Sequence, residues 1–168
     1  MEFVPWRRIA GWRCLSCGDC CKLYSVVINF YEWLRIVKSF GVECTASGVN
    51  RLFLGRRGDG ACAFLGGSAG GAFLCQLQRM KPRACQIWPF KVLHRPDFGF
   101  AGEAEYFLAE NRVYVYADPM CNGLRFGSPS VEFSNFTVRE FVELAAGIRN
   151  HQVKSTSNLR SSMPPFRV

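Results

Sequence analysis

Residues 11–24, "GWRCLSCGDCCKLY", place four cysteines within eight positions, and two of these cysteines are adjacent. Two residues separate Cys14 from Cys17 and Cys17 from Cys20, a spacing that lets successive sulfurs converge on one ion from a tight turn. Gly18 lies inside that turn, where the absence of a side chain relieves the backbone. Core packing alone explains such a dense cluster poorly, so the stretch predicts a metal site.

The adjacent pair Cys20–Cys21 limits how this stretch can bind metal. Neighbouring side chains tend to point apart, so we expect one thiolate to serve the local site and the other to serve a second site or a hydrogen bond. A local site with three ligands then needs a fourth from elsewhere, and the available partners are the distant cysteines: Cys62, Cys75, Cys85 and Cys121. Eight ligands would make two four-thiolate sites, and one site with additional structural thiols is the alternative. The ninth cysteine, Cys44, has no cysteine neighbour and is expected to be a core residue.

Length and charge narrow the class of protein. A chain of 168 residues, 49% hydrophobic, fits one folded domain. No apolar run approaches the ~20 residues of a membrane helix, and the N-terminus lacks the apolar core of a secretory signal. We therefore expect a reducing, cytoplasmic setting and no membrane partner, and there clustered cysteines bind metal rather than forming disulfides. The net charge of +8 counts every cysteine as neutral, so basicity partly balances a thiolate-rich interior, and nucleic acid is a secondary hypothesis for the partner.

Periodicity predicts an α+β fold. Residues 22–30 read as a strand, followed by a helix over residues 31–40 with Asn29 as its N-cap, Glu32 completing a capping box, and Gly41 ending it. Residues 104–118 alternate as a β-hairpin, and a second main helix is expected over residues 138–150, capped by Thr137 with Glu140. We expect a small, irregular single domain over residues 1–150, stapled by thiolate–metal bonds, and a flexible tail over residues 151–168.

The cysteine segments together resemble a known family. "CLSCGDCC", "CAFL", "CQLQRMKPRACQIWPF" and "MCNGLR" are similar, over residues 14–124, to the CxxCxxCC (YkgJ-like) cysteine-cluster family of zinc- or iron-chelating proteins. Lys81-Pro82 stands where that family usually has Arg-Pro, and Gln78 takes the place of a frequent tyrosine. The resemblance implies eight metal ligands, an iron–sulfur cluster or zinc, and a loose label of Fe–S oxidoreductase, and it leaves open whether the chain is an enzyme. A similar cluster in flagellin lysine methylases hints at a role beside methyl transfer.

The spacing favours iron–sulfur over zinc. Structural zinc sites usually pair two CxxC knuckles, whereas iron–sulfur clusters combine a tight local run with a distant cysteine, often beside a proline such as Pro82 or Pro89. An apolar collar is expected to shield the cluster: Trp12, Trp88, Phe90 and Phe64. The main hypothesis is a redox or electron-transfer protein with a redox or protein partner. The alternative is a non-enzymatic, zinc-stabilised module that binds a protein or RNA through basic residues: Arg7, Arg8, Arg56, Arg57 and Lys91.

Overall fold

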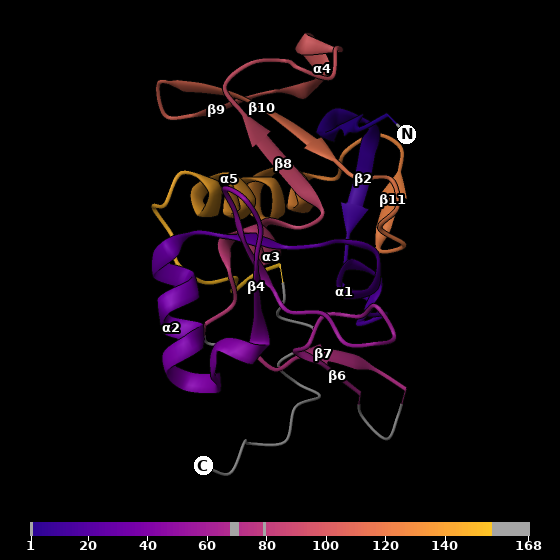
Figure 1. The fold of residues 1–168 in the computed structure, drawn as a ribbon. Coiled ribbons are helices and arrows are strands. Elements are labelled where there is room, and N and C mark those ends of the chain that lie inside the picture. The colour runs from indigo at the N-terminus through magenta and orange to yellow at the C-terminus, as the bar shows by residue number, and fades with distance from the viewer. Residues whose placement is uncertain (1, 68–70, 79, 156–168) are drawn as a thin grey trace. The chain divides into compact units, whose positions relative to one another are not determined.

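Short helices and short antiparallel strands alternate along the chain in the computed structural model, which describes residues 2–67, 71–78 and 80–155 (Figure 1). This mixture confirms the predicted α+β class. The contacts divide the chain into two compact units, which we call unit 1 (Met1–Leu15 with Ile87–Val168) and unit 2 (Ser16–Gln86). Each unit has its own hydrophobic core. No helix within the described ranges is long and apolar enough to cross a membrane.

Unit 1 is built around an antiparallel sheet. The strands of unit 1 are β1 (Val4–Pro5), β2 (Ile9–Trp12), β8 (Phe90–Leu93), β9 (Glu105–Leu108), β10 (Asn111–Ala117) and β11 (Leu124–Phe126). Its helices are the 3-10 helix η1 (Trp6–Arg8), α4 (Ala101–Ala104), the π-helix η3 (Phe133–Val138) and α5 (Arg139–Ala145). Strand β10 pairs with β1, β8 and β9, while β2 pairs separately with β11.

Strand β10 is buried on both faces because each face meets a different cluster. Val113 and Val115 point into the main core of unit 1, where η3 and α5 contribute Phe133 and Phe141. The alternate residues, among them Tyr116, join a smaller cluster with Ala104 of α4. The predicted hairpin is confirmed as β9–β10, whose register pairs residue 108 with residue 111.

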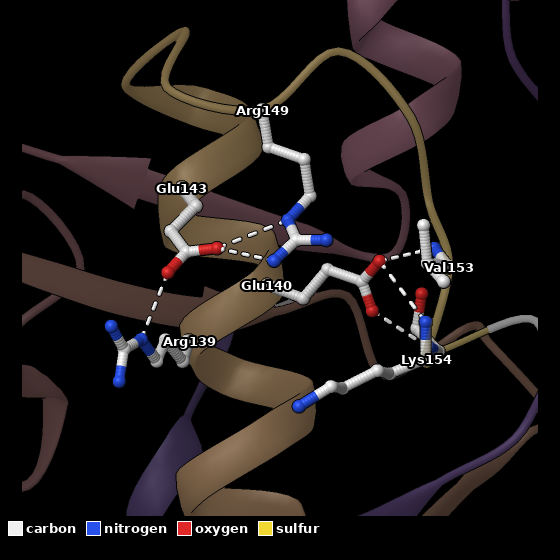
Figure 2. Close-up of polar contacts among 7 residues, drawn as sticks. Arg139, Glu140, Glu143, Arg149, Val153 and Lys154 are labelled. Atoms are coloured by element: carbon white, nitrogen blue, oxygen red, sulfur yellow. Dashed lines mark hydrogen bonds and ion pairs between the residues drawn. The ribbon is translucent and has the colours of Figure 1, made fainter.

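The second main helix, predicted over residues 138–150, differs from the prediction at both ends, and α5 stops at Ala145. The π-helix η3 runs directly into α5, so no capping box forms at Thr137. The carboxylate of Glu140, 1% exposed, instead accepts hydrogen bonds from the backbone N–H groups of residues 153, 154 and 155 (Figure 2). The Glu140 carboxylate, which was predicted to cap the helix with Thr137, therefore bonds to backbone groups that are distant in sequence.

The first residues of the predicted tail are held in place by this same contact. Residues 153–155 follow α5 and return to it through Glu140 (Figure 2). Residues 156–168 lie outside the described part of the chain, so the extent of a flexible tail stays a prediction.

Unit 2 consists of short elements. Its helices are α1 (Asp19–Leu23), α2 (Phe30–Phe40), the 3-10 helix η2 (Val42–Cys44) and α3 (Arg83–Ile87), whose last residue belongs to unit 1. Its strands are β3 (Val27–Ile28), β4 (Thr45–Ser47), β5 (Leu52–Leu54), β6 (Leu65–Gly67) and β7 (Phe73–Cys75). The order β3-β5-β4 makes one small sheet, and β6 with β7 makes a two-stranded one.

Helix α2 confirms the local prediction closely. Asn29 Oδ1 accepts from the N–H of Glu32 at 2.9 Å, and Glu32 Oε2 accepts from the N–H of Asn29 at 2.9 Å, which completes the capping box. Gly41 follows the helix with a φ of +91°. The strand predicted over residues 22–30 is shorter than expected, because residues 19–23 form α1 and only Val27–Ile28 pair as a strand.

Candidate metal centre

Helix α1 carries two of the clustered cysteines, and its geometry begins at Gly18. Gly18 has a φ of +75°, and its carbonyl accepts hydrogen bonds from the N–H groups of Cys21 and Lys22. A Cβ at this position would lie 3.0 Å from Cβ of Phe73 on β7, so glycine is required both for the left-handed conformation and for the close approach. The predicted role of Gly18 is confirmed.

Arg56 fixes the other end of α1. Its Nη2 donates to the carbonyl of Lys22 at 2.6 Å, and its Nη1 donates to the carbonyl of Tyr24 at 2.7 Å. A helix end leaves carbonyl groups without partners, and a guanidinium fork supplies two donors in a fixed geometry. Arg56 therefore holds the segment that carries Cys20 and Cys21.

Three distant cysteines reach the same core from different elements. The N–H of Cys62 donates to the carbonyl of Cys21 at 2.8 Å, which fixes the two residues side by side. Cys75 pairs with Leu65 across the β6–β7 hairpin. Cys85 lies on α3, whose first residue is tied to α2 by the bond from Arg83 N–H to Glu32 Oε1 at 2.8 Å. All of these cysteines, with Cys21, pack into the core of unit 2 beside three apolar side chains: Phe64, Leu77 and Leu54.

We expected the side chains of the adjacent cysteines of α1 to point apart, and this prediction is wrong. The sulfurs of Cys20 and Cys21 lie 3.9 Å from each other. Two thiolates that each lie about 2.3 Å from one tetrahedral zinc ion are about 3.8 Å apart. The separation of these two sulfurs therefore suits two ligands of a single ion.

The thiols of this group share one electrostatic environment. A hydrogen bond from Cys21 lowers the pKa of Cys20 to about 7, and the same hydrogen bond together with burial raises the pKa of Cys21. Burial raises the pKa of three more thiols, and each is also raised by the charge of Cys20: Cys62, Cys75 and Cys85. Burial likewise raises the pKa of Cys17, next to Asp19.

Lys81 supplies a positive charge that acts on several of these thiols. Its positive charge lowers the pKa of Cys20, Cys75 and Cys85. The sequence marked Lys81 as a departure from the family's Arg-Pro pair and as one of the basic residues near cysteines that could balance thiolate charge, and it assigned Arg56 no role beyond the basic surface. The signal for Lys81 was its position between Cys75 and Cys85, whereas no local pattern marks Arg56, which acts on residues more than thirty positions away.

The remaining two predicted ligands lie in unit 1. Cys14 follows Arg13, whose N–H donates to the carbonyl of Gly123 at 3.0 Å, close in sequence to Cys121. The indole N–H of Trp12 donates to the sulfur of Cys121 at 3.3 Å. Of the predicted apolar collar, Phe64 packs with the cysteines of unit 2, while Trp12 packs on Phe90 in unit 1, where Trp88 also belongs.

Cys44 behaves as a core residue. It is partly buried against the core of unit 2, and its thiol donates to the carbonyl of Phe40 at 3.4 Å. The neighbouring residues of α2 and η2 therefore satisfy this thiol locally.

The donor set suits a soft metal centre. Thiolate sulfur is the ligand that zinc and iron–sulfur clusters prefer. As the described side chains stand, no group of three or more histidine, cysteine, aspartate or glutamate residues is positioned to hold a metal ion. The thiols are brought into one neighbourhood, and the ion itself would complete their convergence.

Comparison with known proteins agrees with this chemistry. No curated protein and no solved structure matches the chain. Residues 13–122 match the family model CxxCxxCC, described as a "Putative zinc- or iron-chelating domain". The match begins beside Cys14 and ends just after Cys121, so it contains all eight predicted ligands. The chain belongs to the CxxCxxCC family of zinc- or iron-chelating domains.

Proposed function

We propose that unit 2 holds an iron–sulfur cluster through the thiolates of α1 and of the three distant cysteines, and that the protein transfers electrons in a reducing, cytoplasmic setting. The observation that supports this proposal is the shared core in which Cys21, Cys62, Cys75 and Cys85 pack together, with Cys20 in sulfur contact with Cys21. Bound there, an iron–sulfur cluster would accept and release single electrons.

The chain's own residues supply the surroundings that such a centre needs. Phe64 is 3% exposed and Leu77 is 1% exposed, so they exclude water from the cysteine side of the core. Several thiolates brought into an apolar region repel one another and lose hydration, and Lys81 offsets part of this charge. Burial and nearby charge are the means by which a protein sets a cluster's reduction potential.

A second candidate is a zinc ion that stabilises the fold. The 3.9 Å separation of the Cys20 and Cys21 sulfurs favours it, because it matches two ligands of one tetrahedral ion. The binding surface that this alternative needs has less support. Arg56 donates to backbone carbonyls of its own unit, Arg57 pairs with Asp59, and Lys91 lies over the ring of Phe3.

Metal analysis of protein purified without oxygen separates the two candidates. Iron, zinc and acid-labile sulfide are measured per chain, together with the visible absorption spectrum. About four irons and four sulfides with a brown colour is the expected result for one cubane cluster. Zinc without sulfide in a colourless protein would overturn the redox proposal and make the ion a structural one.

A further inference from the structure

Unit 1 contains a polar pocket that has no cysteine in its lining. Its volume is about 260 Å³, and it is formed by β2, β11, η3 and the segment held by Glu140. The polar residues around it that matter here are Arg13, Arg125, Ser130, Glu132, Lys154 and Ser155. Pockets for drug-sized ligands are roughly 300–1,000 Å³, so this one suits a small molecule or a small group of a larger one.

Positive charge predominates in the pocket. Arg13, Arg125 and Lys154 contribute three cationic groups, against the single carboxylate of Glu132. Within the described residues, no carboxylate forms an ion pair with Arg13 or Arg125. Lys154 lines the pocket, and its ammonium group lies 4.1 Å from the ring centroid of Phe136.

The absence of a side chain at Gly11 leaves room for the guanidinium of Arg125. Gly11 and Arg125 are paired across β2 and β11, and a Cβ on Gly11 would lie 2.9 Å from Nη2 of Arg125. The guanidinium therefore lies over bare backbone. A planar, five-donor group held in this way is suited to bidentate recognition of an oxyanion.

The second observation is a buried hydroxyl without a partner. Ser155 is 7% exposed and lines the pocket, and its Oγ has no hydrogen-bond partner among the residues that the structure describes. Buried polar atoms are rarely left unsatisfied in proteins, so this hydroxyl calls for a ligand. Glu140 fixes the position of Ser155, because the Glu140 carboxylate accepts from the Ser155 N–H at 2.7 Å. Ser130 adds a further hydroxyl, whose Oγ already accepts from the N–H of Phe133.

We propose that this pocket binds a phosphate dianion, either free or as the terminal group of a phosphomonoester. Three cations and the Ser155 hydroxyl can donate hydrogen bonds, which matches the acceptor oxygens of phosphate. The site lies entirely in unit 1 and does not depend on the proposed metal function of unit 2.

Titration calorimetry on the full chain tests the proposal with two probes, inorganic phosphate and phenyl phosphate, at constant ionic strength. We expect both to bind the unaltered protein if the pocket takes free phosphate, and phenyl phosphate alone to bind if it takes a monoester. In either case Arg125→Gln should weaken binding roughly 10- to 100-fold, because a charge-assisted hydrogen bond is lost. Ser155→Ala should weaken it roughly 2- to 10-fold, as expected for a neutral hydrogen bond.

The matched control is Arg95→Gln, which removes one positive charge from an exposed position of unit 1 outside the pocket. This variant should bind as the unaltered protein does. Thermal unfolding of each variant checks that it is folded, and Arg125 is exposed, so its loss leaves the core intact. Absence of binding by both probes, or equal weakening by Arg125→Gln and Arg95→Gln, would overturn the proposal.

Discussion

At the scale of single residues, the thiols of unit 2 differ in what surrounds their sulfur atoms. The thiol of Cys44 donates to the carbonyl of Phe40, so its needs are met within its own segment. The thiols of Cys21 and Cys85 are instead buried among other thiols, an arrangement that raises the pKa of both. A raised pKa favours the protonated thiol, so a metal ion that binds these sulfurs must displace their protons.

This contrast predicts different outcomes for two serine substitutions. Cys85→Ser should lose most of the bound metal and lower the solubility of the protein, because a buried ligand is removed and metal binding is coupled to folding. Cys44→Ser should retain the metal, because serine can make the same bond to the carbonyl of Phe40. Metal content per chain, measured on both variants after identical purification, checks the prediction. Equal metal content would show that Cys85 is not a ligand.

Gly18 allows backbone strain to be separated from crowding. Gly18 and Gly60 have φ values of +75° and +80°, but a Cβ added to Gly18 would have neighbours within 4 Å, whereas one added to Gly60 would have none among the described residues. Gly60→Ala should therefore cost about 1–2 kcal/mol, the left-handed penalty for a residue with a Cβ. Gly18→Ala should cost that amount and about 1–3 kcal/mol more from crowding against Phe73. The free energy of unfolding measures both, and equal losses would contradict the role given to the close approach.

Gly18 precedes helix α1, which carries Cys20 and Cys21, and Arg56 donates hydrogen bonds at the other end of this helix. Arg56→Lys should destabilise unit 2 by about 1–3 kcal/mol and reduce metal retention, because one ammonium replaces a fork that donates to two carbonyls. Arg51→Lys is the matched control, since Arg51 is exposed in the same unit. Denaturant unfolding of the two variants checks this. A loss of stability shared by both would trace the effect to the arginine-to-lysine change in general.

Helix α5 carries the element-scale prediction for pH. Burial alone would raise the pKa of Glu143, but hydrogen bonds from Arg139 and Arg149 outweigh it, and the net pKa is lowered (Figure 2). A carboxyl group whose pKa is lower in the folded state adds stability above its unfolded pKa of about 4.3, and this contribution is lost as the pH falls through the folded value.

Glu143→Gln should therefore destabilise unit 1 by about 1–2 kcal/mol at pH 7, with the difference from the unaltered protein shrinking as the pH falls below about 4. Thermal unfolding across pH 3–7 measures the difference directly. A difference that stayed constant across this range would mean that the two arginines do not stabilise the ionised carboxylate.

The two main helices also mark what the sequence can predict. The cap, length and end of α2 depend on residues within the helix and next to it, such as Asn29 and Glu32, so the local pattern was sufficient. The start of α5 was mispredicted because Glu140 bonds to backbone thirteen to fifteen positions away. Prediction from a local pattern uses residues that are close in sequence, whereas the backbone groups of residues 153–155 that bond to Glu140 are distant from it in sequence.

For the whole molecule, the same limit applies to the predicted metal ligands. The spacing of residues 14–21 marked the local cysteines as candidates. Of the four distant cysteines that were expected to join them, Cys62, Cys75 and Cys85 pack into the same core as Cys21. The division of the chain between Leu15 and Ser16, which assigns Cys14 and Cys121 to unit 1, was not predictable. It arises because β2 pairs with β11, more than a hundred residues further along the chain, and strand pairing over such a separation leaves no local signal.

This division predicts that metal removal acts on one unit. Unit 2 has about 70 residues and a small core that includes several cysteines, and domains of roughly 70–80 residues or fewer usually need a metal or disulfide to be stable. Unit 1 has a core of aromatic and aliphatic residues around β10 and α5 that contains none of the unit 2 cysteines. We expect removal of the metal with ferricyanide and EDTA, followed by reduction of the thiols, to accelerate amide exchange throughout α2 and β5, while β10 and α5 keep their protection. Hydrogen–deuterium exchange with mass spectrometry of the two forms measures this. Equal acceleration in both units would show that they unfold together, and unchanged exchange in unit 2 would show that its fold does not depend on the metal.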